Sequence, residues 1–265
     1  YDFRSTAEFA LTSSLTSATS LGVQYYTRHI EFIGAEGDQF AGPGLATIGA
    51  AAIKPYAEDD YLDNNTLGLF VQEMVGWKDR LFLTGALRVD NNSAFGSDVD
   101  FVAYPKASLS YVMTEEPRVR ELLPDAVETF KLRMAYGQSG TQPAIFSALR
   151  TFAAVTGPNG TPAITPSTVG NPDLKPERGE EIEVGFDAGL LDDRLGFDFT
   201  YYHKRTRDGI LLRATPPSEG FSGSRYINAG ALLNTGIEAL IHATPIRSDR
   251  LVWDMSLNVA TNRGK

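Results

Sequence analysis

Alternation of apolar and polar residues is the feature that most constrains what this chain can fold into. Successive side chains of a β-strand point to opposite faces, so a period of two in hydrophobicity predicts a strand with one apolar and one polar face. Residues 181–188 show the pattern cleanly, because Ile182, Val184 and Phe186 alternate with charged or small residues. It recurs at 3–12, 21–28, 67–75, 81–90, 106–112, 130–137, 195–202, 236–243 and 251–259. The sequence therefore predicts an all-β protein with about ten strands.

Three features favour a membrane barrel over a soluble β-sandwich, which would alternate in the same way. The patterned segments with their flanks run to about 9 to 12 residues, a length that crosses a bilayer at a tilt, whereas soluble strands cluster near about 5 or 6. Their polar face is rich in full charges. Aromatic residues that suit the lipid headgroup level stand near the strand ends of the apolar face, at Phe130, Tyr136, Tyr201 and Trp253. We therefore expect part of the wall of a larger antiparallel transmembrane β-barrel.

The charged residues of the polar face are the candidate functional residues. Burying so many ionised groups in a dry core would cost several kcal/mol for each unpaired one, so we expect them to face a water-filled lumen. Acids and bases occur on neighbouring segments, and some of them are expected to pair. The set is Arg88, Asp90, Lys131, Arg133, Glu181, Glu183, Asp187, Asp198, Glu238 and Asp254. Glu73 breaks the pattern, because it falls on the apolar face with Leu69 and Val71.

The connections predict which end of the barrel faces the cell. Outer-membrane barrels keep short turns on the periplasmic side and long loops outside. Short turns are expected at 77–80, 191–194 and 247–250, with one longer periplasmic connection at 114–127. Long extracellular loops are expected at 30–65, 91–103, 139–178 and 214–224.

Several function classes are disfavoured by composition and by the motifs of the chain. A net charge of -9 and a pI near 4.9 argue against binding of nucleic acid, which needs clustered Lys and Arg. The absence of Cys excludes disulfides, thiolate catalysis and Cys-bound zinc. The nucleophile elbow, the phosphate loop and the zinc-peptidase motif are all missing, so we do not expect an enzyme or a cofactor.

Weaker candidates for chemistry have a simpler explanation in each case. The three histidines are isolated in sequence and carry no metal-ligand spacing. Glu181 and Glu183 lie about 7 Å apart by strand rise, a separation open to a glycosidase pair, but solvated lumen charge is the better interpretation. The acidic runs 58–63 and 98–100 offer oxygen ligands for calcium but match no calcium-loop spacing, so exposed loop acids are favoured.

A resemblance narrows the class further. The segment 170–177, with sequence GNPDLKPE, followed by EEIEVGF at 180–186, resembles a segment that recurs in TonB-dependent receptor barrels. The runs DRLGFDFTYY at 193–202 and TRDGI at 206–210 follow in the family's order. The segment NAGALLNTGIE at 228–238 is similar to the SusC/RagA branch in particular. The similarity covers most of residues 65–265, while residues 1–64 fit by pattern alone.

The resemblance implies active import of a nutrient such as a glycan or peptide across the bacterial outer membrane. It also implies a barrel of 22 strands around a plug domain, contact of the plug with the TonB energy-transducing complex, and a SusD-like lipoprotein partner. We expect residues 1–265 to be an internal piece of the barrel domain, with the plug and the remaining strands outside this sequence. A passive porin or another structural or adhesive outer-membrane β-protein is the alternative.

Overall fold

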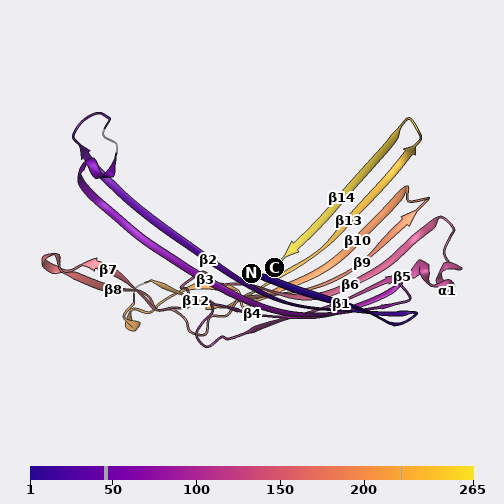
Figure 1. Ribbon diagram of the computed structural model, residues 1–265, viewed down its shortest axis with the longest axis horizontal. Coiled ribbons are helices and arrows are strands. Elements are labelled where there is room, and N and C mark those ends of the chain that lie inside the picture. Colours follow the sequence, from indigo (N-terminus) through magenta and orange to yellow (C-terminus); the bar gives the residue numbers. More distant parts are fainter. Residues whose placement is uncertain (45–46, 222) are drawn as a thin grey trace.

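The structure is one curved, open antiparallel sheet with loops and two small hairpins at one end (Figure 1). The computed structural model describes residues 1–44, 47–221 and 223–265, without the side chain at position 55. The ten strands of the sheet are β1 (Asp2–Thr12), β2 (Leu15–Phe40), β3 (Ala51–Trp77), β4 (Leu81–Asn92), β5 (Val102–Val112), β6 (Val127–Thr141), β9 (Glu177–Leu190), β10 (Leu195–Arg207), β13 (Ala231–Arg247) and β14 (Val252–Gly264).

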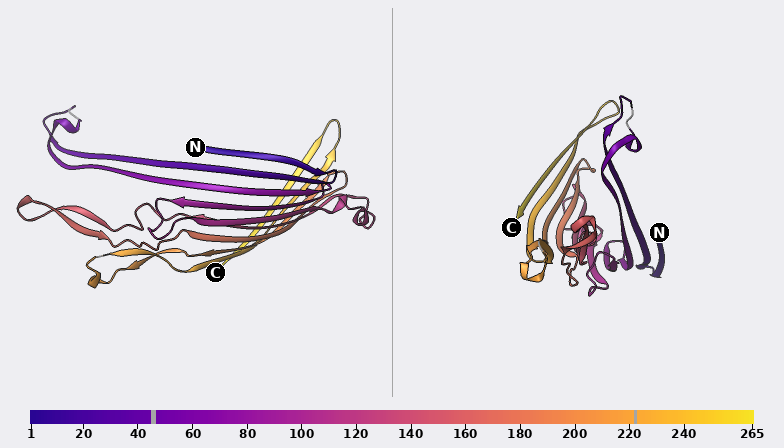
Figure 2. Two further views of the ribbon diagram at one scale, coloured as in Figure 1. Left: turned by 60° about the horizontal axis from the view of Figure 1, so that its bottom comes forward. Right: turned by 90° about the vertical axis from the view of Figure 1, so that its left-hand side faces the viewer.

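The strands pair in sequence order, β1-β2-β3-β4-β5-β6-β9-β10-β13-β14, so the sheet is a meander whose first and last strands form its two edges (Figure 2). The interruptions in the numbering are two hairpins, β7 (Thr151–Thr156) with β8 (Pro162–Thr168) and β11 (Ile210–Ala214) with β12 (Ser224–Asn228). Ten strands that curve without closing are the partial barrel wall that the alternation predicts. Among the described residues, no helix combines the length and the apolar character that a membrane crossing requires.

The register brings residues of like character together across the strands. Asp187 on β9 lies opposite Lys131 on β6 and Asp198 on β10, all on the polar face. Phe186, one position along, lies opposite Leu132 and Phe199 on the apolar face. Because the side-chain period is two, a slip of one residue would exchange these faces, and the alternation therefore fixes the register.

The short connections at one end of the sheet agree with the sequence. β3 and β4 join through a tight three-residue turn, 78–80, in which Lys78 and Asp79 both have positive φ and the Arg80 N–H donates to Trp77 O at 3.2 Å. The longer connection predicted at 114–127 contains the 3-10 turn η2 (Met113–Glu115) and the short helix α1 (Pro117–Arg120).

The predicted loop at 30–65 is wrong. β2 continues to Phe40 and β3 starts at Ala51, and the two strands stay paired to Phe40–Ala51, with η1 (Ile48–Ala50) before β3. The other long connections are loops with some structure of their own: 139–178 holds the β7–β8 hairpin and η3 (Pro158–Gly160), and 214–224 holds η4 (Pro217–Glu219).

The buried apolar residues gather at the loop end of the sheet. Phe95, Val102 and Tyr104 form the buried apolar cluster, with Val99 against it. Leu174, in the segment 170–177, is fully buried. Both faces of the sheet are exposed in this chain, so the sheet itself encloses no hydrophobic core. The small core that exists is formed by the loops and the strand ends beside them.

The segment 170–177 ties this loop end together. The Gly96 N–H donates to Leu174 O at 2.9 Å, which fixes the β4–β5 loop. The Lys175 N–H donates to the Asn228 side chain at 2.8 Å, which fixes the β11–β12 hairpin. A side chain at Gly96 would place its Cβ 1.9 Å from Pro172 O, so only glycine allows the two loops to approach this closely. The segment 170–177, which resembles TonB-dependent receptors, therefore holds the β4–β5 loop and the β11–β12 hairpin together.

Candidate functional site on the polar face

A chain of ion pairs crosses three strands on the polar face. Lys131 Nζ on β6 lies 2.6 Å from Asp187 Oδ2 on β9, and Arg133 Nε lies 2.8 Å from Asp187 Oδ1. Arg133 Nη2 then reaches Asp198 Oδ1 on β10 at 2.5 Å. Each of these side chains keeps a quarter or more of its surface exposed. Four of the ten predicted site residues are thus brought together, in a setting where water still screens their charges.

Other candidates pair locally. Arg88 Nε contacts Asp90 Oδ1 on its own strand at 2.7 Å and donates from Nη2 to Gln24 on β2. Glu181 pairs with Lys204 on β10 at 3.2 Å. The bond to Gln24 spans the intervening strand β3, and the pair of Glu181 and Lys204 joins the neighbouring strands β9 and β10.

The remaining candidates are Asp254, Glu183 and Glu238. Asp254 accepts a hydrogen bond from the Thr244 hydroxyl at 2.6 Å. Glu183 and Glu238 make no side-chain hydrogen bond or ion pair with the part of the chain that the structure describes. Within the described residues, the carboxylates of Glu183 and Glu238 can therefore bind water or another molecule.

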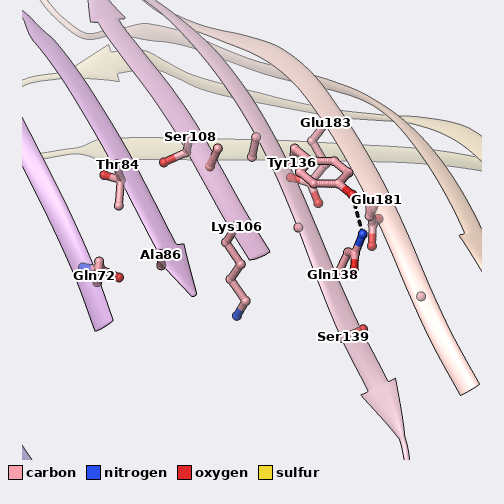
Figure 3. A pocket seen from close by; sticks show the side chains of 14 residues that line it. Gln72, Thr84, Ala86, Lys106, Ser108, Tyr136, Gln138, Ser139, Glu181 and Glu183 are labelled. Carbon is pink, nitrogen blue, oxygen red and sulfur yellow. Dashed lines mark hydrogen bonds between the residues drawn. The ribbon is translucent and has the colours of Figure 1, made fainter. Parts of the chain in front are cut away.

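A hollow of about 380 Å³ lies in the middle of the polar face (Figure 3). Its floor is β6, where Gly137 and Ala135 carry little or no side chain. Lys106 on β5 and Glu181 on β9 both lie opposite Gly137, one on each side, and Glu183 lies opposite Ala135. Neighbouring strands are about 4.8 Å apart, and β6 lies between β5 and β9. The backbone positions of Lys106 and Glu181 are therefore roughly 10 Å apart across the hollow. The hollow can accept a dipolar or hydrogen-bonding group between a cation and two acids.

Sequence reasoning missed Lys106 and Lys204 as site residues. Lys204 lies beyond the end predicted for its strand, but β10 runs on to Arg207 and Lys204 keeps the alternation of Asp198 and Thr200. Lys106 begins a predicted strand and shares a face with Ser108, which was the available signal. Among the described residues, no three His, Asp or Glu side chains gather closely enough to hold a metal ion.

Comparison with known proteins places the chain in a family. A family model described as "TonB dependent receptor-like, beta-barrel" matches residues 1–263. The chain belongs to this family. Its members are bacterial outer-membrane β-barrels, and the family is one of receptors and transporters rather than enzymes.

Curated relatives of this receptor chain include TonB-dependent receptor P26 of Formosa agariphila, 28% identical over 78% of this chain and 21% of that protein. TonB-dependent receptor SusC of Bacteroides thetaiotaomicron is 24% identical over 77% of this chain and 21% of that protein. The chain thus spans about a fifth of the length of these relatives.

Solved structures share the fold. The RagAB peptide transporter matches all of this chain and 30% of its own with a TM-score of 0.90 and 21% identity. The outer membrane transporter YddB from Escherichia coli matches with a TM-score of 0.67 and 13% identity, over 100% of this chain and 33% of that one. The expected fold, a piece of a TonB-dependent receptor barrel with SusC- and RagA-like relatives, is confirmed.

Proposed function

We propose that this chain forms part of the barrel wall of a SusC/RagA-type receptor that imports a nutrient, such as a glycan or a peptide, across the outer membrane in a TonB-dependent manner. The observation that carries the proposal is the charged, hollowed polar face on a sheet of this family. A wall of this kind can offer hydrogen bonds and charges to a polar solute passing through the barrel.

The polar face is proposed to line the lumen, and the apolar face to meet lipid. The ion pairs of Lys131, Arg133, Asp187 and Asp198 are partly exposed, which suits a compartment shared with water. The apolar face carries half-exposed Ile182, Val184 and Leu257, which would suit acyl chains. The end with short turns is then periplasmic and the end with loops and hairpins is extracellular.

In this proposal, the plug domain, the remaining barrel strands and the partner proteins lie outside residues 1–265. A plug domain inside the complete barrel contacts the TonB complex, and unpaired Glu183 and Glu238 are available to it or to the substrate. A SusD-like lipoprotein binds on the extracellular side and captures the substrate first. Resemblance to SusC and to the RagAB transporter supports this arrangement.

The experiment separates active import from a passive pore. Uptake of candidate oligosaccharides and oligopeptides is measured in cells that carry the complete receptor, with and without TonB, and with a proton uncoupler. Import that stops in both cases supports the proposal. Uptake that continues at the same rate without TonB would instead establish the porin alternative.

A further inference from the structure

The alternation of β10 continues past the apolar part of the strand. Lys204 Nζ lies 3.2 Å from Glu181 Oε2 of β9, on the polar face. Arg205 is the next residue, so its side chain points to the opposite, apolar face. Arg207 also lies on the apolar face, because its Nη2 contacts Oε2 of Glu180, the residue beside Glu181, at 2.8 Å. Two arginines of β10 thus project from a face that is otherwise apolar.

A third arginine projects from the same face on β14, which is separated from β10 by β13 alone (Figure 1). Leu233 of β13 lies opposite Arg205. Thr235, the next residue of β13 on that face, lies opposite Arg263 of β14. At about 4.8 Å per strand spacing, the backbones at Arg205 and Arg263 are roughly 10 to 12 Å apart. Arg205, Arg207 and Arg263 are all exposed, and we call them the arginine patch.

The arginine patch lies just beyond the apolar run of its strands. β10 leaves its short turn at Leu195, and its residues on the apolar face are hydrophobic up to Tyr201. A tilted strand crosses the apolar layer of a bilayer in about 10 residues, and Arg205 is the eleventh from Leu195. On β14, Arg263 likewise comes ten positions after Trp253. The patch therefore stands at the level of the lipid head groups, at the end of the sheet that carries the long loops.

The charges on this face favour an anion. The whole chain carries a net charge of -9. In β10 and β14, which the structure describes throughout, the apolar face nevertheless carries three arginines past the apolar run and no acid. Glu180 of β9 pairs with Arg207, while Arg205 and Arg263 make no ion pair within the described residues. A guanidinium binds phosphate through parallel, charge-assisted hydrogen bonds, so the patch fits a phosphate-bearing ligand.

We propose that the arginine patch binds an anionic lipid, whose phosphate groups contact the guanidiniums and whose acyl chains lie along the apolar face. This inference rests on the proposed function, in which that face meets lipid. In a complete barrel the plug lies inside and further strands continue the sheet sideways, so neither covers the outward face. Basic clusters beside a membrane-embedded apolar surface recognise anionic head groups. A second copy joined symmetrically through the patch would bring arginines against arginines.

Lipid binding by the purified complete receptor tests the patch. Fluorescent lipid A, a phosphorylated glycolipid, is titrated onto the receptor in detergent micelles. The double variant Arg205→Gln with Arg207→Gln should bind it about ten-fold or more weakly, and the control Lys204→Gln, on the polar face between them, less than about two-fold more weakly. Arg263→Gln, on another strand, should weaken binding about three-fold or more and serves should the double variant not fold.

Three outcomes of the titration would overturn the proposal. The first is an equal loss of binding in Lys204→Gln and in the arginine variants. The second is wild-type binding of dephosphorylated lipid A as tight as that of lipid A. The third is displacement of the lipid by an equal concentration of inorganic phosphate, which would show a site for a free anion.

Photo-crosslinking in outer membranes gives an independent measurement. A photoreactive amino acid replaces Leu233, beside the patch, or Leu232, the next residue on the polar face. We expect adducts with anionic lipid from 233 at least about five-fold stronger than from 232. Adducts from 233 with protein alone, or with uncharged lipid alone, would defeat this inference and leave the proposed import intact. Lipid adducts from 232 but not from 233 would exchange the faces and defeat the proposed lumen as well.

Discussion

Arg133 on β6 reaches Asp198 on β10 across the intervening strand β9, with 2.5 Å between Nη2 and Oδ1, and holds Asp187 of β9 on the way. The guanidinium thus joins three strands at one point of the polar face. Removing one partner of such a bridge is costly in a dry core, because a buried charge is left unpaired, but costs little in a wet lumen, because water solvates the remaining charge.

Replacing Arg133 with Ala should therefore lower the free energy of unfolding of the complete receptor by about 1 kcal/mol or less. Denaturant unfolding in detergent measures the change. Lys204→Ala, which removes the pair with Glu181, is the matched control and should behave alike. A loss of about 3 kcal/mol or more for Arg133→Ala would indicate that these charges are buried away from water.

Ile182→Arg should destabilise the barrel by about 2 to 4 kcal/mol if Ile182 meets the middle of the bilayer, and Phe199→Arg and Leu257→Arg should do the same. Glu183→Arg, one position from Ile182 on the other face, is the control and should cost less than about 1 kcal/mol. Folded receptor in outer membranes is quantified for each variant. Wild-type amounts for all three apolar-face variants would disprove the lipid-facing assignment.

Single cysteines test the two faces directly, since the chain has none of its own. Cysteines at 132, 184 and 255 should react with a lipid-soluble, bilayer-restricted thiol probe, while those at 133, 183 and 254 should not. Labelling is measured in outer membranes that contain the complete receptor. The reverse contrast would exchange the faces and remove the lumen interpretation of the charged residues.

Gly236→Ala should destabilise the barrel by about 1 to 3 kcal/mol. Tyr202 packs against the bare backbone of Gly236, and an added Cβ would lie 2.6 Å from Tyr202 Oη and 2.0 Å from Thr261 O. Gly85→Ala is the control, because no atom lies within 4 Å of its added Cβ. In denaturant unfolding Gly85→Ala should be neutral or stabilising by up to about 1 kcal/mol. Equal losses for both variants would contradict the close packing at Gly236.

The pairing of β2 with β3 at His29 and Asp63 should be sensitive to pH. A hydrogen bond to Asp63, with 2.6 Å between Nδ1 and Oδ1, and the charge of Asp63 raise the pKa of His29. Because the folded-state pKa is raised, the pair stabilises this part of β2 and β3 fully below the ordinary value of 6.5, and this stabilisation is lost as the pH rises through the raised value. The NMR titration of His29, identified by its loss in His29→Gln, should shift down in Asp63→Asn. An unchanged midpoint in Asp63→Asn would show that the pair does not form in solution.

The alternation alone was enough to predict the ten-stranded wall, its two faces and its short turns. A wall between lipid and water imposes opposite demands on successive residues, and such demands are visible in sequence. The alternation also marked Glu73 as an exception. Only the structure shows what holds Glu73 on the apolar face: hydrogen bonds from the hydroxyls of Ser17 and Thr19 on β2, with 2.5 Å from Thr19 Oγ1 to Glu73 Oε2.

The continuation of β2 and β3 into residues 30–65 was not predicted, because the alternation fails there. Both faces of this part of the ribbon are exposed, so nothing imposes a period of two, and 30–65 with its acids and glycines has the character of a loop. The backbone pairing of β2 with β3 continues there regardless, because hydrogen bonds between main chains do not depend on side-chain polarity. The partners of the site were likewise set by tertiary structure: Arg133 and Asp198 are 65 positions apart, and only the order of the strands brings them together.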